Sequence, residues 1–183
     1  DFVHTRLTHS LEVSVVARSL GRKVGVKILE KYPSLETIHG YKANDFGSIV
    51  AAAALAHDIG NPPFGHSGEK AIGHFFKNGS GKNYKSELNP KQYQDLCDFE
   101  GNANGFKILT QDVKGRPGGL RLSYATLGAF TKYPKGSLPI KPNSHIAFKK
   151  YGFFQSELET FSLLAKELGL LKLEDSPETL YSR

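Results

Sequence analysis

The chain is short of sulfur and of long apolar stretches. It has a single cysteine, Cys97, and no methionine. One thiol cannot form a disulfide within the chain, which fits a reducing compartment and predicts a cytoplasmic protein with Cys97 buried. The longest apolar block covers residues 49–56, whereas a membrane span needs about 20 apolar residues, so we expect no membrane association. Because the sequence begins with DFVH and not with Met, we expect it to be a segment of a longer protein.

The rest of the composition is that of a folded domain of ordinary size. Of its 183 residues, 39% are hydrophobic and 23% are charged, enough for one domain over residues 1–183 with a substantial core. Lys and Arg number 24 against 18 acidic residues, a net charge of +6. This excess favours a polyanionic partner such as a nucleotide, nucleic acid or acidic lipid. The basic residues are scattered, however, which fits a solvated surface equally well.

Apolar residues recur mostly at steps of three and four, the spacing of amphipathic helices. Few segments alternate as strands do, so we predict an all-α fold. The expected helices cover residues 7–29 and 47–58, start at Ser67 and at Pro90, cover 105–110 and 122–132, and start again after Ser156.

The first two helices carry the first candidate site. In the helix over 7–29, His9 lies on the same stripe as Val16 and Leu20, so we expect its imidazole to face inward. The helix over 47–58 is apolar on nearly all sides, which predicts a central, buried position.

Local signals predict where several helices begin and end. We expect Gly60 to cap the second helix, after which Pro62 and Pro63 forbid continuation. Residues 156–159 read as a capping box, and Gly169 reads as the stop of the last helix. The helix that starts at Ser67 is expected to bury Ala71, Ile72, Phe75 and Phe76.

His57 and Asp58 stand side by side at the end of the second helix. At the last turn both side chains can lean toward one ion beyond the helix end, and burying them without a partner is costly. One imidazole and one carboxylate suit a divalent metal such as Mn, Fe, Zn or Mg. His9 supplies a third ligand from the neighbouring helix, which is how bundle cores build metal sites. A lone histidine on an apolar stripe is more often a core residue, so the hypothesis depends on all three residues together.

Several longer stretches of the chain form a recognisable series. They are residues 6–10 (RLTHS), 57–69 (HDIGNPPFGHSGE), 99–103 (FEGNA), 124–134 (YATLGAFTKYP) and 150–157 (KYGFFQSE). In this order they resemble the signatures of HD-domain phosphohydrolases, and within them the deoxynucleoside triphosphate triphosphohydrolases, or dGTPase-like proteins. The stretch over 57–69 is the most specific of the series.

The resemblance implies an HD-domain helical bundle with one divalent metal held by His9, His57, Asp58 and a second Asp further along. The other aspartates lack the apolar helix that the family uses for that ligand, so we expect it beyond residue 183. The implied reaction cleaves a deoxynucleoside triphosphate between the α-phosphorus and the deoxyribose 5′ oxygen, which gives a deoxynucleoside and inorganic triphosphate. The alternatives are another nucleotide as substrate of the same HD site, or an inactive sensor of nucleotides or single-stranded nucleic acid.

Two residues are candidates for the proton transfer that this reaction needs. The break at Pro62 and Pro63 frees His66 to protonate the departing 5′ oxygen as a general acid, since imidazole titrates close to neutral pH. Glu69 is expected to orient that imidazole and favour its protonated form. Their structural alternatives are a loop histidine and a carboxylate that stabilises a helix N-terminus.

The remaining candidates bind substrate. Arg6 can grip phosphate oxygens with its planar guanidinium. The resemblance implies further phosphate and sugar contacts from Lys132, Tyr133 and Lys150, although surface lysines are more often only solvated. Asn61 and Asn102 are candidate hydrogen-bonding side chains of the same site, with a helix cap as the alternative for Asn102. As partners the resemblance implies the dNTP substrate, a homo-oligomer, and an allosteric nucleotide or single-stranded DNA.

Overall fold

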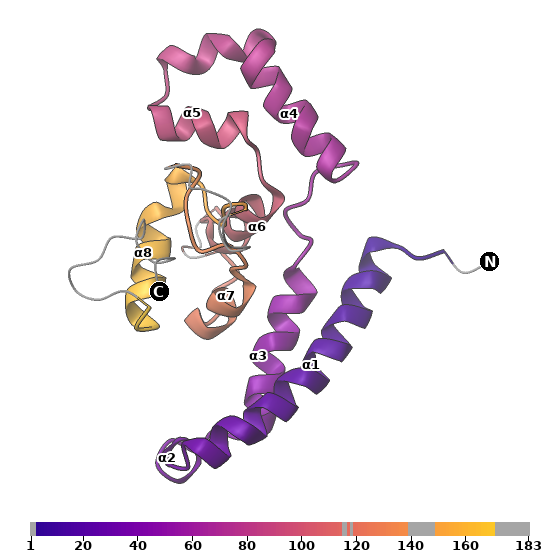
Figure 1. Cartoon of the computed structure of the whole chain (residues 1–183), viewed down its shortest axis with the longest axis vertical. Helices are drawn as coiled ribbons and strands as arrows, with labels where there is room; N and C mark the ends of the chain where they lie inside the picture. Colours follow the sequence, from indigo (N-terminus) through magenta and orange to yellow (C-terminus); the bar gives the residue numbers. More distant parts are fainter. Residues whose placement is uncertain (1–2, 115–116, 118, 139–148, 171–183) are drawn as a thin grey trace. The chain divides into compact units, whose positions relative to one another are not determined.

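A computed structural model describes residues 3–114, 117, 119–138 and 149–170. These residues form helices joined by loops, with no strand among them (Figure 1), which confirms the predicted all-α class. The chain divides into two compact units, Asp1–Asp58 and Ile59–Arg183, and a single domain over all 183 residues stays a prediction. None of the described helices is both long and apolar enough to cross a membrane.

The first unit is a helical hairpin. Helix α1 covers Arg6–Lys31, the short α2 covers Ser34–Thr37, and α3 covers Ala43–Ala56 (Figure 1). Thr5 caps α1 by accepting a hydrogen bond from the Thr8 backbone N–H at 3.2 Å, as N-cap threonines do. The predicted helix over 7–29 is therefore confirmed, with slightly wider bounds.

Small residues mediate the packing of α1 against α3. A Cβ added to Gly21 would lie 3.0 Å from the Cα of Gly47, so the two backbones pass too close for a larger side chain. The Ser14 hydroxyl donates to the Ala51 carbonyl oxygen at 2.9 Å. The buried residues of the pair are Ser10, Gly21, Gly25, Gly47, Ala51 and Ala53.

The prediction that the apolar stripe of α1 with Val16 and Leu20 faces inward is wrong. Val16 is 60% exposed and Leu20 is 57% exposed, while the neighbouring face of small residues is the buried one. The expectation of a fully buried second helix is also wrong, because Val50 and Leu55 of α3 are exposed. Periodicity shows that a helix has an apolar face, but the close approach of two helices selects the face with the smallest side chains.

The second unit contains the remaining helices and a core of large apolar side chains. The rings of Phe106 and Phe161 meet edge to face, with centroids 5.8 Å apart, and Phe153 stacks on Phe161 at 4.1 Å. Leu109 and Leu164 of the same unit are fully buried as well. The elements are α4 (His66–Asn78), η1 (Ser80–Ser86), α5 (Pro90–Cys97), α6 (Gly101–Thr110), α7 (Tyr124–Phe130), η3 (Gln155–Glu157) and α8 (Leu158–Glu167).

Most of the residues predicted to begin or end helices in this unit do so. Asn89 caps α5 through a reciprocal capping box with Gln92, and Pro90 is the first helical residue. Gly169 follows α8 with φ of 66°, the left-handed conformation that ends many helices. The prediction of a capping box at residues 156–159 is wrong, because the Ser156 hydroxyl donates to the Glu157 carboxylate and α8 has no side-chain cap. The reason is the 3₁₀ turn η3, which moves Ser156 away from the start of α8.

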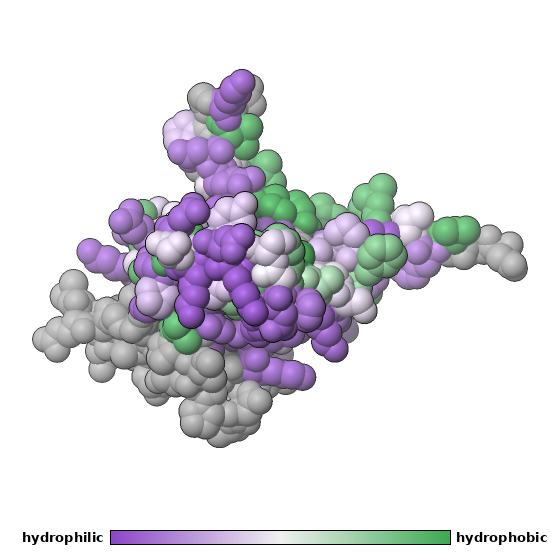
Figure 2. Space-filling model, turned by 90° about the horizontal axis from the view of Figure 1, so that it is seen from above, coloured by the Kyte–Doolittle hydropathy of each residue, from purple (hydrophilic) through white to green (hydrophobic). Residues whose placement is uncertain are grey.

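The segment around η1 lies on the surface. Seen from above, the described residues of α4, η1 and α5 present mostly hydrophilic side chains (Figure 2). Of the expected interior of α4, Ala71 and Phe75 are exposed, which corrects that prediction, while Ile72 and Phe76 are half-buried. The sequence also predicts a turn at residues 116–119 and an irregular segment over 134–150, and both lie partly outside the described residues.

Gly60 has a different role from the predicted helix cap. Helix α3 ends at Ala56 with His57 as its cap, and Gly60 is not among the described glycines with positive φ. It is buried, and a Cβ there would clash with the backbone of Gly101 and Gly105 in α6. Glycine is therefore required at this position for the close approach of the loop to α6.

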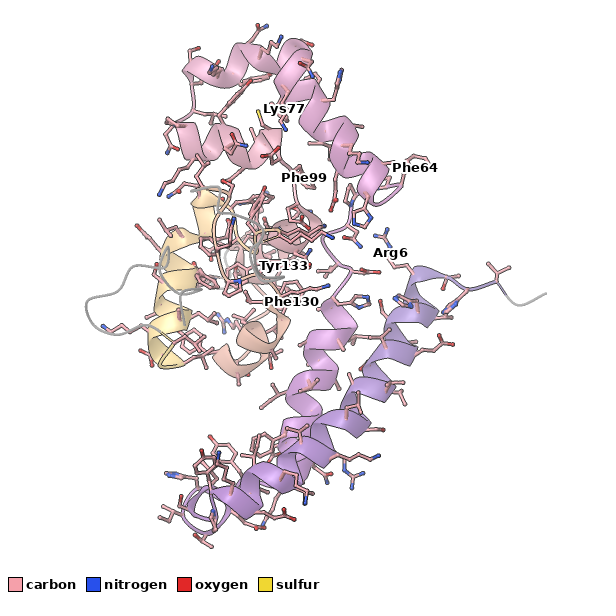
Figure 3. The ribbon with its side chains drawn as sticks, viewed as in Figure 1. Arg6, Phe64, Lys77, Phe99, Phe130 and Tyr133 are labelled. Atoms are coloured by element: carbon pink, nitrogen blue, oxygen red, sulfur yellow. The ribbon has the colours of Figure 1, made fainter. Side chains whose placement is uncertain are left out.

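A tight turn over Pro62–Gly65 leads into α4. The Gly65 N–H donates to the Pro62 carbonyl oxygen at 3.0 Å, and Phe64 has a φ of 64°. A residue at the third position of a type II turn needs positive φ, which favours glycine. Phe64 is 92% exposed and lies at the start of α4 (Figure 3), so packing does not compensate for this backbone conformation.

Replacing Phe64 with glycine is expected to raise the free energy of unfolding by about 0.5–1 kcal/mol. Glycine removes a left-handed penalty of about 1–2 kcal/mol, part of which is offset by its greater freedom in the unfolded chain. Urea denaturation measures the change. The control, Phe64→Ala, keeps the Cβ and loses only an exposed ring, so its unfolding free energy should stay within about 0.5 kcal/mol of the original. Equal changes in both variants would rule out backbone strain.

Candidate metal centre and catalytic groove

The three predicted metal ligands lie together in the first unit. Ligand atoms of His9, His57 and Asp58 all lie within 4.8 Å of one another, and the three residues are half-buried. The His9 Nε2 is 3.9 Å from Asp58 Oδ2, and the His57 Nε2 is 3.3 Å from Asp58 Oδ1. The packing of α1 on α3 brings His9 to the end of α3, where His57 and Asp58 follow the last helical residue.

The end of α3 also orients the His57 ring. Its Nδ1 lies 2.7 Å from the Ala54 carbonyl oxygen, which also accepts the His57 backbone N–H at 3.3 Å in the last turn of the helix. A proton on Nδ1 that is donated to this carbonyl leaves the Nε2 lone pair for a metal, a common arrangement for metal-binding histidines. This contact was not among the predictions from the sequence, although a histidine at a helix C-terminus is a signal for it.

The donor set fits a divalent cation. Two imidazole nitrogens and one carboxylate suit Mn, Fe, Zn or related ions. Arg6 begins α1 three residues before His9 (Figure 3). Residues at this spacing lie on one face of a helix, so Arg6 and His9 leave α1 on the same side.

A groove of about 390 Å³ lies in the second unit, along α4. Three of the predicted site residues line it: His66, Glu69 and Lys150. Lys77 and Phe99 also contribute to its walls (Figure 3). His66 is the first residue of α4 and is exposed, so its imidazole is open to a ligand.

Glu69 has a different partner from the expected one. Its Oε1 accepts a hydrogen bond from the Gly101 N–H at 2.8 Å, and its Oε2 lies 4.0 Å from the Lys150 Nζ. The structure gives it no hydrogen bond to His66 among the described residues. The first N–H groups of α6 lack helical partners and carry partial positive charge, so they attract this carboxylate more effectively than a neighbouring exposed ring.

Glu100 is a residue of the groove that sequence analysis did not single out. It caps α6, is 6% exposed, and accepts hydrogen bonds from Asn102 and Lys150. The predicted cap role for Asn102 therefore belongs to Glu100. The sequence of residues 99–103 contains a signal for this cap, because an acidic residue directly precedes glycine there. The cap was not predicted because α6 was expected to begin only at Gly105.

Tyr151, the residue after Lys150, anchors the segment around Lys150 in the core. The buried Tyr151 hydroxyl donates to the carbonyl oxygens of Asp95 and Asp98, each at 2.9 Å. Burial, and then the charges of Asp95 and Glu100, raise the pKa of the Tyr151 phenol far above its usual range. Burial also raises the pKa of the Asp95 carboxyl, although its Oδ2 accepts the Gln155 N–H at 2.6 Å.

The other predicted substrate contacts lie elsewhere in the second unit. Asn61 is half-buried, and its Oδ1 lies so close to Gly101 that a Cβ there would clash with it. The Tyr133 ring is buried (Figure 3). The exposed Lys132 places its Nζ 5.5 Å from the centre of that ring. Neither Lys132 nor Tyr133 lines the groove along α4.

Comparison with known proteins identifies relatives over nearly the whole chain. The HD domain family model matches residues 6–96. A deoxyguanosinetriphosphate triphosphohydrolase-like protein of Pseudomonas aeruginosa is 45% identical over 178 residues, which cover 96% of this chain and 38% of the relative. A protein of the same name from Synechocystis is 47% identical over 176 residues, covering 92% of this chain and 39% of the relative.

A relative with the full enzyme name is more distant. The deoxyguanosinetriphosphate triphosphohydrolase of Klebsiella pneumoniae is 35% identical over 209 aligned residues, which cover 97% of this chain and 40% of that protein. The chain thus spans about two fifths of the length of the curated relatives that it matches.

Proposed function

We propose that this chain, which belongs to the HD-domain family, carries the metal centre of a hydrolase that converts deoxynucleoside triphosphates into deoxynucleoside and inorganic triphosphate. The observation that carries the proposal is the convergence of His9, His57 and Asp58 within 4.8 Å. The names of the relatives support this substrate class and make dGTP the first substrate to test.

His9, His57 and Asp58 would hold the divalent ion. When bound, such an ion supplies Lewis acidity toward the α-phosphate and toward the attacking water. The protein orients one ligand for it, because the Ala54 carbonyl accepts the Nδ1 proton of His57. Arg6 would bind phosphate oxygens through two parallel N–H groups.

His66 would act as the general acid of the reaction. The oxygen of a water molecule bonds to the α-phosphorus and releases one proton to solvent, the bond between phosphorus and the 5′ oxygen breaks, and the His66 imidazolium gives its proton to that oxygen. Without this proton the leaving group is an unstable alkoxide, which is why general acid catalysis is effective here. Glu69 would act through the backbone, because its bond to the Gly101 N–H ties α4 to α6.

Lys150 is the best-supported substrate contact in the second unit, since it lines the groove that also contains His66. Asn61, Asn102, Lys132 and Tyr133 are proposed as further contacts to phosphate or sugar. We also propose a homo-oligomeric, cytoplasmic protein with a nucleotide or single-stranded DNA as a candidate effector.

Product analysis tests the reaction. The full-length protein is incubated with Mn²⁺ and each of the four dNTPs, and the products are separated by ion-exchange chromatography. Deoxynucleoside and inorganic triphosphate in equal amounts are the expected products. Nucleoside monophosphate with pyrophosphate would refute the proposed bond cleavage, and binding without any turnover would favour a nucleotide sensor.

A further inference from the structure

The carboxylate of Glu100 lies at the centre of a small polar cluster. Its Oε1 accepts hydrogen bonds from the Asn102 side-chain amide at 2.6 Å and from the Asn102 backbone N–H at 3.3 Å. The Lys150 Nζ lies 3.0 Å from both Oε1 and Oε2. The Glu100 side chain is 8% exposed, against 23% for Lys150.

These contacts join two residues that are proposed to bind substrate. Asn102 lies on α6, and Lys150 lies 50 residues from Glu100 in the sequence. A buried carboxylate is costly unless donors surround it, and here both donor side chains belong to the proposed substrate contacts. No other described carboxylate accepts hydrogen bonds from both of them.

The arrangement reduces the freedom of Lys150 before any ligand arrives. A lysine stem has many rotamers, and fixing it during binding weakens affinity. Glu100 holds the ammonium through both carboxylate oxygens, and Glu69 lies 4.0 Å from the same nitrogen. An ammonium has three N–H donors, and Lys150 lines the groove, so donor capacity remains for an anion there.

We infer that Glu100 is a positioning residue that holds the Lys150 ammonium and the Asn102 amide in place for the phosphate oxygens of the substrate. The inference rests on the proposed function for the identity of that substrate. Glu100 itself does not contact the substrate, because its oxygens are occupied by its two partners and it carries the same negative charge as the phosphates.

The variant Glu100→Gln tests this role in the full-length protein. Glutamine keeps the size of the side chain and an acceptor for Asn102, but it loses the charge and turns an N–H₂ group toward the lysine. We expect the KM for dGTP to rise about tenfold while kcat stays within about threefold, since ground-state positioning of an anion contact is lost. In a Lys150→Met background the same substitution should have little further effect on KM.

The chain offers a matched control in the ion pair between Lys107 and Glu157. This pair also joins residues 50 apart at 2.8 Å, and the Glu157 side chain is likewise 8% exposed, but it does not line the groove. Glu157→Gln should lower the thermal midpoint about as much as Glu100→Gln and leave KM unchanged. The positioning role would be overturned if Glu157→Gln and Glu100→Gln changed KM equally. It would also be overturned if the effects of Glu100→Gln and Lys150→Met on KM were fully additive.

Calorimetry with inorganic tripolyphosphate separates this inference from the proposed function. We expect Glu100→Gln, but not Glu157→Gln, to weaken tripolyphosphate binding about tenfold. If the original protein hydrolyses no dNTP but binds tripolyphosphate in this Glu100-dependent way, the proposed function alone fails. If hydrolysis occurs and neither KM nor binding responds to Glu100→Gln, the inference alone fails. If there is neither hydrolysis nor binding, both are overturned.

Discussion

Replacing His57 with alanine is expected to lower dNTP hydrolysis by about 10³-fold or more. A divalent ion contributes several kcal/mol of charge stabilisation in the transition state, and about 4 kcal/mol corresponds to this factor. His57 combines an Nε2 near Asp58 with a fixed ring orientation through Ala54, so its loss removes one ligand and the order of the site together. The bound metal, measured by elemental analysis, should fall in parallel with the rate.

His39→Ala is the control for this substitution. His39 lies in the same unit, is exposed, and its ring meets Tyr41 at 6.4 Å, so the variant should keep its metal and its rate. Removing the metal from the original protein with a chelator should abolish activity, and Mn²⁺ should restore it. A His57→Ala protein that retains both metal and activity would refute the metal centre.

Replacing His66 with alanine is expected to lower kcat with dGTP by about 10²–10⁴-fold, the usual contribution of a general acid. The reason is the alkoxide leaving group, which needs a proton as its bond to phosphorus breaks. The imidazole is exposed at the first position of α4 and lines the groove, so its loss should leave the fold intact. Steady-state kinetics with dGTP, together with a circular dichroism spectrum, measures both effects.

A change of leaving group provides the control for His66. In p-nitrophenyl triphosphate the leaving phenolate is a stable anion that departs without protonation. The His66→Ala protein should therefore hydrolyse this compound at a rate within about threefold of the original protein. An equal loss with both substrates would assign His66 to substrate binding or to local structure, and not to proton transfer.

Sequence patterns predicted the helices well where the signals lie within a few residues. Asn89 and Pro90 start α5 as expected, and Gly169 ends α8. The pairing of His57 with Asp58 at a helix end is a local feature as well. Such signals act through the backbone of adjacent residues, so they need no knowledge of what packs against them.

Predictions that required a choice of partner were less successful. For Glu69 the nearest candidate in the sequence was His66, but its hydrogen-bond donor is Gly101, 32 residues away. For α1, the apolar side chains at Val16 and Leu20 suggested the buried face, whereas α3 packs against the glycine face. In both cases several partners satisfy the local pattern, and only the three-dimensional packing selects one.

The sequence by itself therefore determined the helical class, several helix ends and the candidate pair of His57 with Asp58, because these follow from short-range spacing and from the chemistry of the side chains. His9 was added to the pair through the family resemblance and the match of the three residue types, since the stripe on which it was placed is not the buried face of α1. The tertiary structure decided which helix face is buried, why Gly60 must be glycine, and which residues share the carboxylate of Glu100. These depend on contacts between segments as far apart as Glu100 and Lys150. Such contacts leave no periodic trace in a single sequence, since their energy depends on distances that exist only after the chain has folded.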